Sequence, residues 1–172
     1  MGMMVDLQSA AGPALVVGGG TIATRKVRGL AEAEFQVTVI SPAVSDEIRL
    51  APHATVIERP FSPDDLAGDT RYALVFACTD DRTVNCEIGR LARLANIPVV
   101  VTDAQEESTF FTPAVLRDGD LAIAVSTGGA SPRIARSIRE YIVASIGPGW
   151  APILGLARKE RQSRKGRHDD DD

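Results

Sequence analysis

The chain has 172 residues, of which 44% are hydrophobic and 24% charged, and its net charge at pH 7 is −4. This length allows one domain or one domain with an appendage, and this composition excludes a wholly disordered chain. The acidic balance argues against a nucleic-acid partner. No stretch approaches the roughly 20 apolar residues that span a bilayer, and the N-terminus lacks the pattern of a signal peptide. We therefore expect a cytoplasmic protein without a membrane partner.

Short apolar runs alternate with helical patterns over the first hundred residues. This order predicts an α/β fold with a mostly parallel sheet and helices on both faces. We expect strands over residues 14–17, 36–40, 54–59, 72–77 and 98–102, with a short helix possible after the second strand. We expect longer helices over 21–33, with Ile22, Val27 and Leu30 toward the core, and over 81–94, with Val84, Ile88, Leu91 and Leu94 on one stripe.

The pattern changes after Asp103. Strands over 113–117 and 121–125 flank Asp118-Gly119, a hairpin turn pair, and a helix over 132–146 starts with Ser131 as its N-cap. A hairpin and one helix cannot bury a core alone, so they must pack on the first domain or on another subunit. The charged tail from about Arg158 is expected to be disordered. The predicted domains are residues 1–112, residues 113–147 and a short C-terminal segment, residues 148–172.

A glycine-rich loop follows the first strand and opens the first helix. It reads Gly18-x-Gly20-x-x-Ala23, which in this context predicts dinucleotide binding. Gly18 permits the tight turn, Gly20 lets the backbone approach a pyrophosphate, and Ala23 allows helix and strand to pack closely. The pyrophosphate would lie at the N-terminus of the helix. The predicted cofactor contacts are Gly18, Gly20, Thr21, Ile22, Ser41, Pro42, Thr79 and Asp80.

The identity of the dinucleotide stays open on spacing alone. NAD-binding loops usually carry an acid at the end of the second strand, where this chain has Ser41-Pro42. Arg25 and Lys26 raise NADP as a possibility, although a solvated helix face would explain them equally. At the end of the fourth strand, Asp80 or Asp81 either caps the next helix or borders the cofactor.

Three stretches together carry a family resemblance: LVVGGGTIATRKVRGL, LVFACTDDRTVN and VVVTDAQEESTFFTPAVLRDGDLAIAVSTGGASPRIARSIRE. They resemble the precorrin-2 dehydrogenase family, which is related to the N-terminal part of siroheme synthase. The resemblance implies a Rossmann-type domain followed by a small dimerisation unit, and therefore a homodimer. It also implies NAD-dependent oxidation of precorrin-2 to sirohydrochlorin in siroheme biosynthesis, and it favours NAD over NADP.

The resemblance also implies the site residues. The family's aspartate at the end of the fifth strand falls on Asp103, where an acid beside a nicotinamide can take a proton or orient the macrocycle. The alternative is that Asp103 only caps a loop. The substrate is rich in carboxylates, so its site should offer basic and N–H donors. The predicted substrate contacts are Ser126, Thr127, Gly128, Gly129, Ser131, Arg133 and Arg136. The alternative is that Arg133, Arg136 and Arg139 form a solvated face of the helix and bind no substrate.

Other side chains have less specific interpretations. Cys78 and Cys86 lack a disulfide or metal spacing and are predicted to be small buried side chains. Phe110 and Phe111 are predicted to pack in the core or at a dimer interface, or else to stack on a macrocycle. His53 and His168 do not predict a metal site.

Two alternative functions remain open. Some family members also insert ferrous iron, so the chain could be a bifunctional dehydrogenase and ferrochelatase, although the region after Ile146 is short for that activity. The chain could also be a non-catalytic NAD(H)-sensing module. Such modules usually carry the ribose-binding acid that this sequence lacks.

Overall fold

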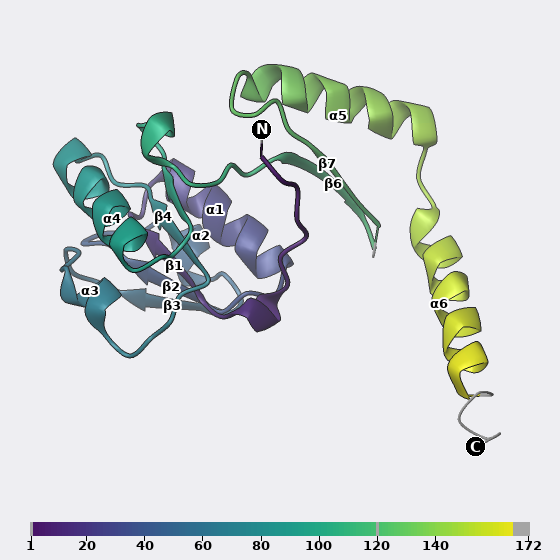
Figure 1. Cartoon of the computed structure of the whole chain (residues 1–172), viewed down its shortest axis with the longest axis horizontal. Helices are drawn as coiled ribbons and strands as arrows, with labels where there is room; N and C mark the ends of the chain where they lie inside the picture. Colours follow the sequence, from purple (N-terminus) through teal and green to yellow (C-terminus); the bar gives the residue numbers. More distant parts are fainter. Residues whose placement is uncertain (1, 120, 167–172) are drawn as a thin grey trace. The chain divides into compact units, whose positions relative to one another are not determined.

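The computed structural model describes residues 2–119 and 121–166. They form two compact units, Gly2–Phe110 and the residues from Phe111 onward, hereafter the N-terminal unit and the C-terminal unit. Each unit has its own sheet (Figure 1).

The N-terminal unit is built on a parallel five-stranded sheet with the order β3-β2-β1-β4-β5. Its central strand β1 is buried along its whole length, as expected for an apolar strand covered on both faces. The predicted α/β fold with a parallel sheet is confirmed. The strands are β1 (Ala14–Val17), β2 (Val37–Ile40), β3 (Ala54–Ile57), β4 (Leu74–Ala77) and β5 (Val99–Val101).

Helices cover both faces of this sheet (Figure 1). Side chains of α1 (Thr21–Glu32) and α2 (Asp46–Arg49) pack into the core on one face. Side chains of α3 (Asp64–Ala67) and α4 (Arg82–Leu94) pack into the core on the other. The sequence did not predict α3, because one helical turn is too short to show a helical period. Two 3-10 turns, η1 (Ser9–Ala11) and η2 (Gln105–Glu107), complete the unit.

The predicted inward face of α1 was wrong at one position. Ile22 is 41% exposed, whereas Ala23, Val27 and Leu30 are buried. Ile22 lies in the first turn of the helix, next to the glycine loop. The buried stripe instead begins at Ala23, one residue later.

The predicted inward face of α4 was also shifted. Leu94 is 69% exposed, and the buried residues are Asn85, Ile88, Gly89 and Ala92. A Cβ added at Gly89 would lie 2.8 Å from Cγ2 of Val101. Because α4 lies so close to β5, small residues face the sheet and the larger leucines lie beside or beyond the contact.

The two cysteines differ in exposure. Cys78, directly after β4, is buried as predicted, whereas Cys86 is exposed. Cys86 follows the buried Asn85 by one position on α4, which turns its side chain away from the sheet. The prediction that Cys86 is buried was therefore wrong.

The C-terminal unit pairs a hairpin with a helix. Strands β6 (Ala114–Asp118) and β7 (Leu121–Val125) are antiparallel, and α5 (Pro132–Ile146) packs against both. The register pairs Asp118 with Leu121, so Asp118 belongs to the strand and not to the predicted turn. Ser131 caps α5 as predicted, since its hydroxyl accepts a hydrogen bond from the amide of Ile134 at 3.2 Å.

A further helix, α6 (Trp150–Gly166), occupies much of the segment that the sequence predicted to be disordered from Arg158. Its composition explains the difference, because Leu, Ala, Arg, Lys, Glu and Gln are strong helix formers. The carboxylate of Asp118 also accepts hydrogen bonds from the first amides, those of Gly149 at 3.1 Å and Trp150 at 2.8 Å. His168 and the terminal aspartates lie outside the described residues.

Within residues 2–119 and 121–166, no helix has both the length and the apolar composition needed to cross a bilayer.

Candidate functional site

The strand order of the N-terminal unit locates a ligand crevice. Strands β2 and β3 lie on one side of β1 and strands β4 and β5 on the other, and open α/β sheets bind ligands outside the carboxyl ends of the strands at such a switch point. The hydrogen-bond ladder continues one residue past these ends. The amide of Gly18 donates to the carbonyl of Ile40 at 2.9 Å, and that of Cys78 donates to the carbonyl of Val17 at 2.8 Å. The loops after β1, β2 and β4 therefore start at one edge.

The three glycines after β1 have different tasks. Gly18 has φ +120°, and a Cβ there would lie 2.4 Å from the carbonyl oxygen of Cys78. A Cβ at Gly19 would lie 1.9 Å from the carbonyl oxygen of Ala43. A Cβ at Gly20 would meet no protein atom within 4 Å. The first two glycines are thus required by packing within the protein, whereas the third borders open space.

This open space lies at the N-terminus of α1. Gly20 is the N-cap residue, no side chain caps the helix, and its first turn has no acidic residue. Amides of Thr21 and Ile22 therefore begin a helix whose dipole and N–H groups favour an anion. Ala23 is fully buried against the sheet. These residues fit the pyrophosphate of a dinucleotide.

The end of β2 offers little to a cofactor phosphate. The side chain of Ser41 is 7% exposed overall, and its hydroxyl donates to the carbonyl of Ala43 at 2.7 Å. Pro42 is exposed beside it. Lys26, one of the two residues that raised NADP, is directed elsewhere: its Nζ lies 5.4 Å from the ring centroid of Phe76 on β4. Burial lowers the pKa of Lys26, so a solvated helix face does not describe this residue either.

The end of β4 carries three polar residues with separate roles. Asp81 is the N-cap of α4, because its carboxylate accepts hydrogen bonds from the amides of Thr83 at 2.8 Å and Val84 at 3.3 Å. Asp80 is exposed at the same edge. The hydroxyl of Thr79 lies 2.7 Å from Oδ1 of Asn85. Of the two aspartates considered for capping, Asp81 takes that role and leaves Asp80 free of it.

The end of β5 carries Asp103, whose side chain is 36% exposed. Its Oδ2 accepts a hydrogen bond from Nδ2 of Asn85 at 3.0 Å, and its Oδ1 lies 3.9 Å from Nη1 of Arg82. Arg82 also forms an ion pair with Glu107. Neither Asn85 nor Arg82 was predicted to belong to the site. The available signal was an asparagine three residues before Ile88 on the buried face of α4.

The two phenylalanines after β5 separate. Phe110 packs edge-on against Phe76, with ring centroids 5.6 Å apart, and joins the core of the N-terminal unit. Phe111 is 43% exposed.

The loop before α5 holds the predicted substrate residues of the C-terminal unit. The hydroxyl of Thr127 accepts from the amide of Ser131 at 3.0 Å and donates to its carbonyl at 3.1 Å, so it closes the loop. Ser126 is exposed, and its hydroxyl accepts from the amide of Gly128 at 3.2 Å. Of the two adjacent hydroxyls, that of Ser126 is more available to a ligand. Arg133 and Arg136 lie in the first two turns of α5, and their side chains are exposed.

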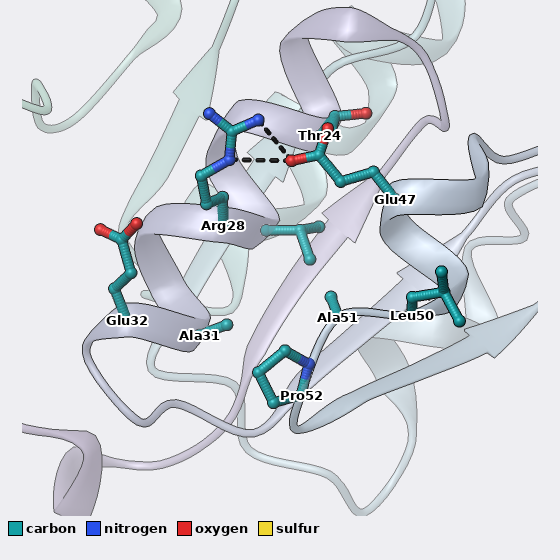
Figure 2. Close-up of a pocket in the computed structure, with 9 residues that line it drawn as sticks. Thr24, Arg28, Ala31, Glu32, Glu47, Leu50, Ala51 and Pro52 are labelled. Carbon is teal, nitrogen blue, oxygen red and sulfur yellow. Dashed lines mark hydrogen bonds and ion pairs between the residues drawn. The ribbon is translucent and has the colours of Figure 1, made fainter.

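Two hollows lie away from the glycine loop. One, of about 530 Å³, lies between α1 and the segment after α2, and the Arg28–Glu47 ion pair crosses its rim (Figure 2). Another, of about 610 Å³, lies on the outer side of α4. The first is lined by Thr24, Val27, Arg28, Ala31, Glu32, Glu47, Leu50, Ala51 and Pro52, and the second by Arg82, Thr83, Cys86, Glu87 and Arg90. None of these residues was predicted to bind cofactor or substrate.

Among the described residues, no group of three or more histidine, cysteine, aspartate or glutamate side chains gathers as metal ligands would. His53 is exposed in the loop before β3.

Two family models match the chain. Residues 3–114 match a family described as "Putative NAD(P)-binding", and residues 118–145 match one described as "Sirohaem biosynthesis protein central". The first match covers most of the N-terminal unit, and it confirms the prediction that this unit binds a nicotinamide dinucleotide.

Individual relatives agree with these matches. The chain is 38% identical to a siroheme synthase of Nitrosomonas europaea over 151 residues, which is 86% of this chain and 31% of that protein. It is 39% identical to a siroheme synthase of Methylobacillus flagellatus over 162 residues, which is 90% of this chain and 33% of that protein. The chain thus spans about a third of the length of these relatives.

A solved structure also matches. The structure of SirC, a precorrin-2 dehydrogenase, superposes with a TM-score of 0.69 at 26% identity, over 92% of this chain and 77% of that one. The chain belongs to the family described as "Putative NAD(P)-binding", and its similarity to siroheme synthases and to a precorrin-2 dehydrogenase confirms the predicted resemblance.

Proposed function

We propose that this chain catalyses the NAD-dependent dehydrogenation of precorrin-2 to sirohydrochlorin. One observation carries the proposal: a part-exposed carboxylate, Asp103, lies at the same edge of the sheet as an open glycine loop. The names of the relatives, siroheme synthase and precorrin-2 dehydrogenase, support the substrate.

In this proposal, different residues of the N-terminal unit bind the cofactor and accept the proton. Gly20 and the amides that begin α1 bind the pyrophosphate, and Thr79 and Asp80 border the cofactor. NAD, when bound, would supply the hydride acceptor for this oxidation. Precorrin-2 must also release a proton as its conjugation extends, and Asp103 accepts that proton as a general base. The products are then sirohydrochlorin, reduced cofactor and one proton.

The C-terminal unit supplies carboxylate binding in this proposal. The macrocycle carries many carboxylates, which suit the guanidinium groups of Arg133 and Arg136 and the hydroxyl of Ser126. The amide of Gly128 donates to the Ser126 hydroxyl and so orients that hydroxyl, and the amide of Gly129 adds a donor in the same turn, where the two glycines have φ values of +62° and +84°. Ser131 accepts a capping hydrogen bond from the amide of Ile134, which leaves its O–H able to donate to a carboxylate, so it stays a proposed substrate contact.

A homodimer is part of the proposal. On α5, Ile134, Ile138 and Tyr141 are 55%, 43% and 75% exposed and recur at helical spacing. An apolar stripe of this kind is typical of an interface. We also propose that the protein works in the cytoplasm, where its thiols stay reduced.

NAD is the proposed cofactor rather than NADP. Ser41 is turned into its own loop, and Lys26 is directed to β4, so neither meets a 2′-phosphate at the end of β2. Titration with both dinucleotides should therefore give tighter binding, or at least equal binding, of NAD⁺.

The direct test is an anaerobic incubation of the protein with precorrin-2 and NAD⁺, without metal, followed by absorption spectroscopy. We expect the spectrum of sirohydrochlorin to appear only when NAD⁺ is present. Binding of NAD⁺ without any change in the tetrapyrrole would instead favour the sensing module. A second incubation with sirohydrochlorin and ferrous iron tests the bifunctional alternative.

Replacement of Asp103 by alanine tests its role. We expect turnover to fall about 10²- to 10⁴-fold, the usual range for loss of a general base, with little change in the affinity for NAD⁺. Unaltered turnover would remove Asp103 from the mechanism.

A further inference from the structure

Asn85 is a polar residue in a wholly buried place. Its side chain is 0% exposed on the face of α4 that packs against the sheet. Burial of a carboxamide is costly unless its polar atoms find partners. Its Oδ1 accepts from the amide of Thr79 at 3.0 Å and from its hydroxyl at 2.7 Å. Its Nδ2 donates to the carbonyl of Thr79 at 3.0 Å and to Oδ2 of Asp103 at 3.0 Å.

The backbone of Thr79 decides which way this carboxamide faces. A backbone amide can only donate and a backbone carbonyl can only accept, so one orientation of the Asn85 side chain satisfies both. In that orientation the second N–H of Nδ2 is the one that reaches Asp103. The rotated carboxamide would place its oxygen against a carboxylate oxygen of Asp103 and lose both bonds to the backbone of Thr79. Thr79 thus fixes Asn85 as a donor to Asp103.

The other neighbour of Asp103 holds it less firmly. Nη1 of Arg82 lies 3.9 Å from Oδ1, and the Arg82 side chain is 48% exposed. Its guanidinium also pairs with Glu107, whose Oε2 is buried without a hydrogen-bond partner among the described residues. A buried donor with fixed geometry therefore meets one carboxylate oxygen, and a solvated cation lies near the other.

We propose that Asn85 is a positioning residue that sets the orientation of the Asp103 carboxylate against the loop after β4. This inference rests on the proposed function, because it gives Asn85 its effect through the proposed base. Its consequence is specific. One carboxamide bonds both the loop that borders the cofactor and the acid that accepts the proton, so the two keep a fixed separation.

A thermodynamic cycle tests the role in catalysis. Asn85→Ala should lower kcat about 10- to 100-fold, as small misplacements of catalytic groups do, and leave the KM for NAD⁺ within a few-fold. In an Asp103→Ala background the same substitution should cause no further loss, because the group through which it acts is gone. Asn85→Gln, which keeps the carboxamide but shifts it by one methylene, should fall between wild type and Asn85→Ala.

Thr109→Val is the matched control. It removes the hydrogen bond from the amide of Val99 to the Thr109 hydroxyl, 2.8 Å long, at the opposite end of β5 from Asp103. This variant should lose stability yet keep kcat. Equal losses from Asn85→Ala in both backgrounds, or an unchanged kcat, would overturn the proposal.

A measurement without turnover separates this inference from the proposed function. In a ¹H–¹⁵N spectrum of the full chain, the Asn85 side-chain amide is identified by its loss in Asn85→Ala. We expect this resonance to shift in Asp103→Ala, which removes the acceptor of one of its N–H groups, and to stay in place in Thr109→Val. If the wild-type chain turns over no precorrin-2, the proposed function fails, and this resonance still decides the bond. A resonance that is insensitive to Asp103→Ala would overturn the inference.

Discussion

The two units of this chain use their apolar residues in opposite ways. In the N-terminal unit, apolar strands and helix faces are buried in two continuous clusters on either side of the sheet. In the C-terminal unit, Ala135 is the one buried hydrophobic residue among those described, and α5 leaves Ile134 and Tyr141 largely exposed. The first unit therefore buries enough apolar surface to stabilise itself, whereas the second leaves most of its apolar surface uncovered, as the proposed homodimer would require.

The largest effect should come from a cavity in the N-terminal unit. Ile88 is fully buried between α4 and the sheet. Ile88→Ala should lower the free energy of unfolding by about 2–5 kcal/mol, the range for large-to-small core substitutions. Denaturation in urea measures the change. A loss well below 1 kcal/mol would break the comparison, because it would mean that the first unit does not depend on this packing.

A smaller effect should separate folding from cofactor binding in the glycine loop. Gly19→Ala forces a Cβ against the carbonyl of Ala43, and we expect a loss of about 1–3 kcal/mol in stability from overpacking. The matched variant Gly20→Ala meets no protein atom and should keep its stability but bind NAD⁺ more weakly. Thermal melts and NAD⁺ titrations of both variants give the answer. A destabilised Gly20→Ala with normal affinity would contradict the assigned roles.

The C-terminal unit should respond to a change that barely affects the first. Ile138 is 43% exposed on α5, so Ile138→Ser should change the stability of the single chain by only about 0.5 kcal/mol, as most surface substitutions do. It should nevertheless weaken self-association, which sedimentation at several concentrations measures. Leu94→Ser, on an exposed position of α4, is the control and should leave self-association unchanged. A wild-type chain that stays monomeric would refute the proposed partner.

The smallest effect on stability at neutral pH is expected from the ionisation of the thiols of Cys78 and Cys86, which differ in exposure. Burial raises the pKa of Cys78 from its ordinary value of 9.0 to about 12. Because the folded value is the higher one, the related stability is fully present below pH 9 and is lost as the pH rises toward 12. At pH 8 a thiol reagent should therefore modify Cys86 and spare Cys78 in the folded protein, and modify both after unfolding. Rapid modification of Cys78 would show that its cover opens.

The sequence predicted the sheet better than it predicted which helix residues face it. A short apolar run such as Ala14–Val17 predicts a buried strand, and the structure confirms that strand with the same bounds. The inward positions of α4 were mispredicted because a periodicity analysis looks for large apolar residues. In this helix a small residue, Gly89, faces the sheet and lets the helix approach Val101.

The candidate site likewise contains residues with a local sequence pattern and residues whose role depends on the fold. The sequence could single out Asp103 and Gly20 as candidates, because Asp103 follows an apolar strand and Gly20 precedes a helix in a recognisable glycine pattern. Asn85 was missed because its importance depends on Thr79 and Asp103, which only the folded chain brings within hydrogen-bond distance. Buried polar side chains on an otherwise apolar helix face are the signal to look for in such sequences.

The contact between Gly19 and the segment after β2 has a consequence for binding. The carbonyl of Gly19 accepts a hydrogen bond from the amide of Ser45 at 3.2 Å, while the hydroxyl of Ser45 bonds with that of Thr24 at 2.9 Å. The loop is thereby braced before any dinucleotide arrives. A preorganised loop surrenders little conformational entropy on association, so more of its contact energy remains as affinity. Dinucleotide capture by this chain should then resemble the docking of two rigid bodies rather than the folding of a loop around its ligand.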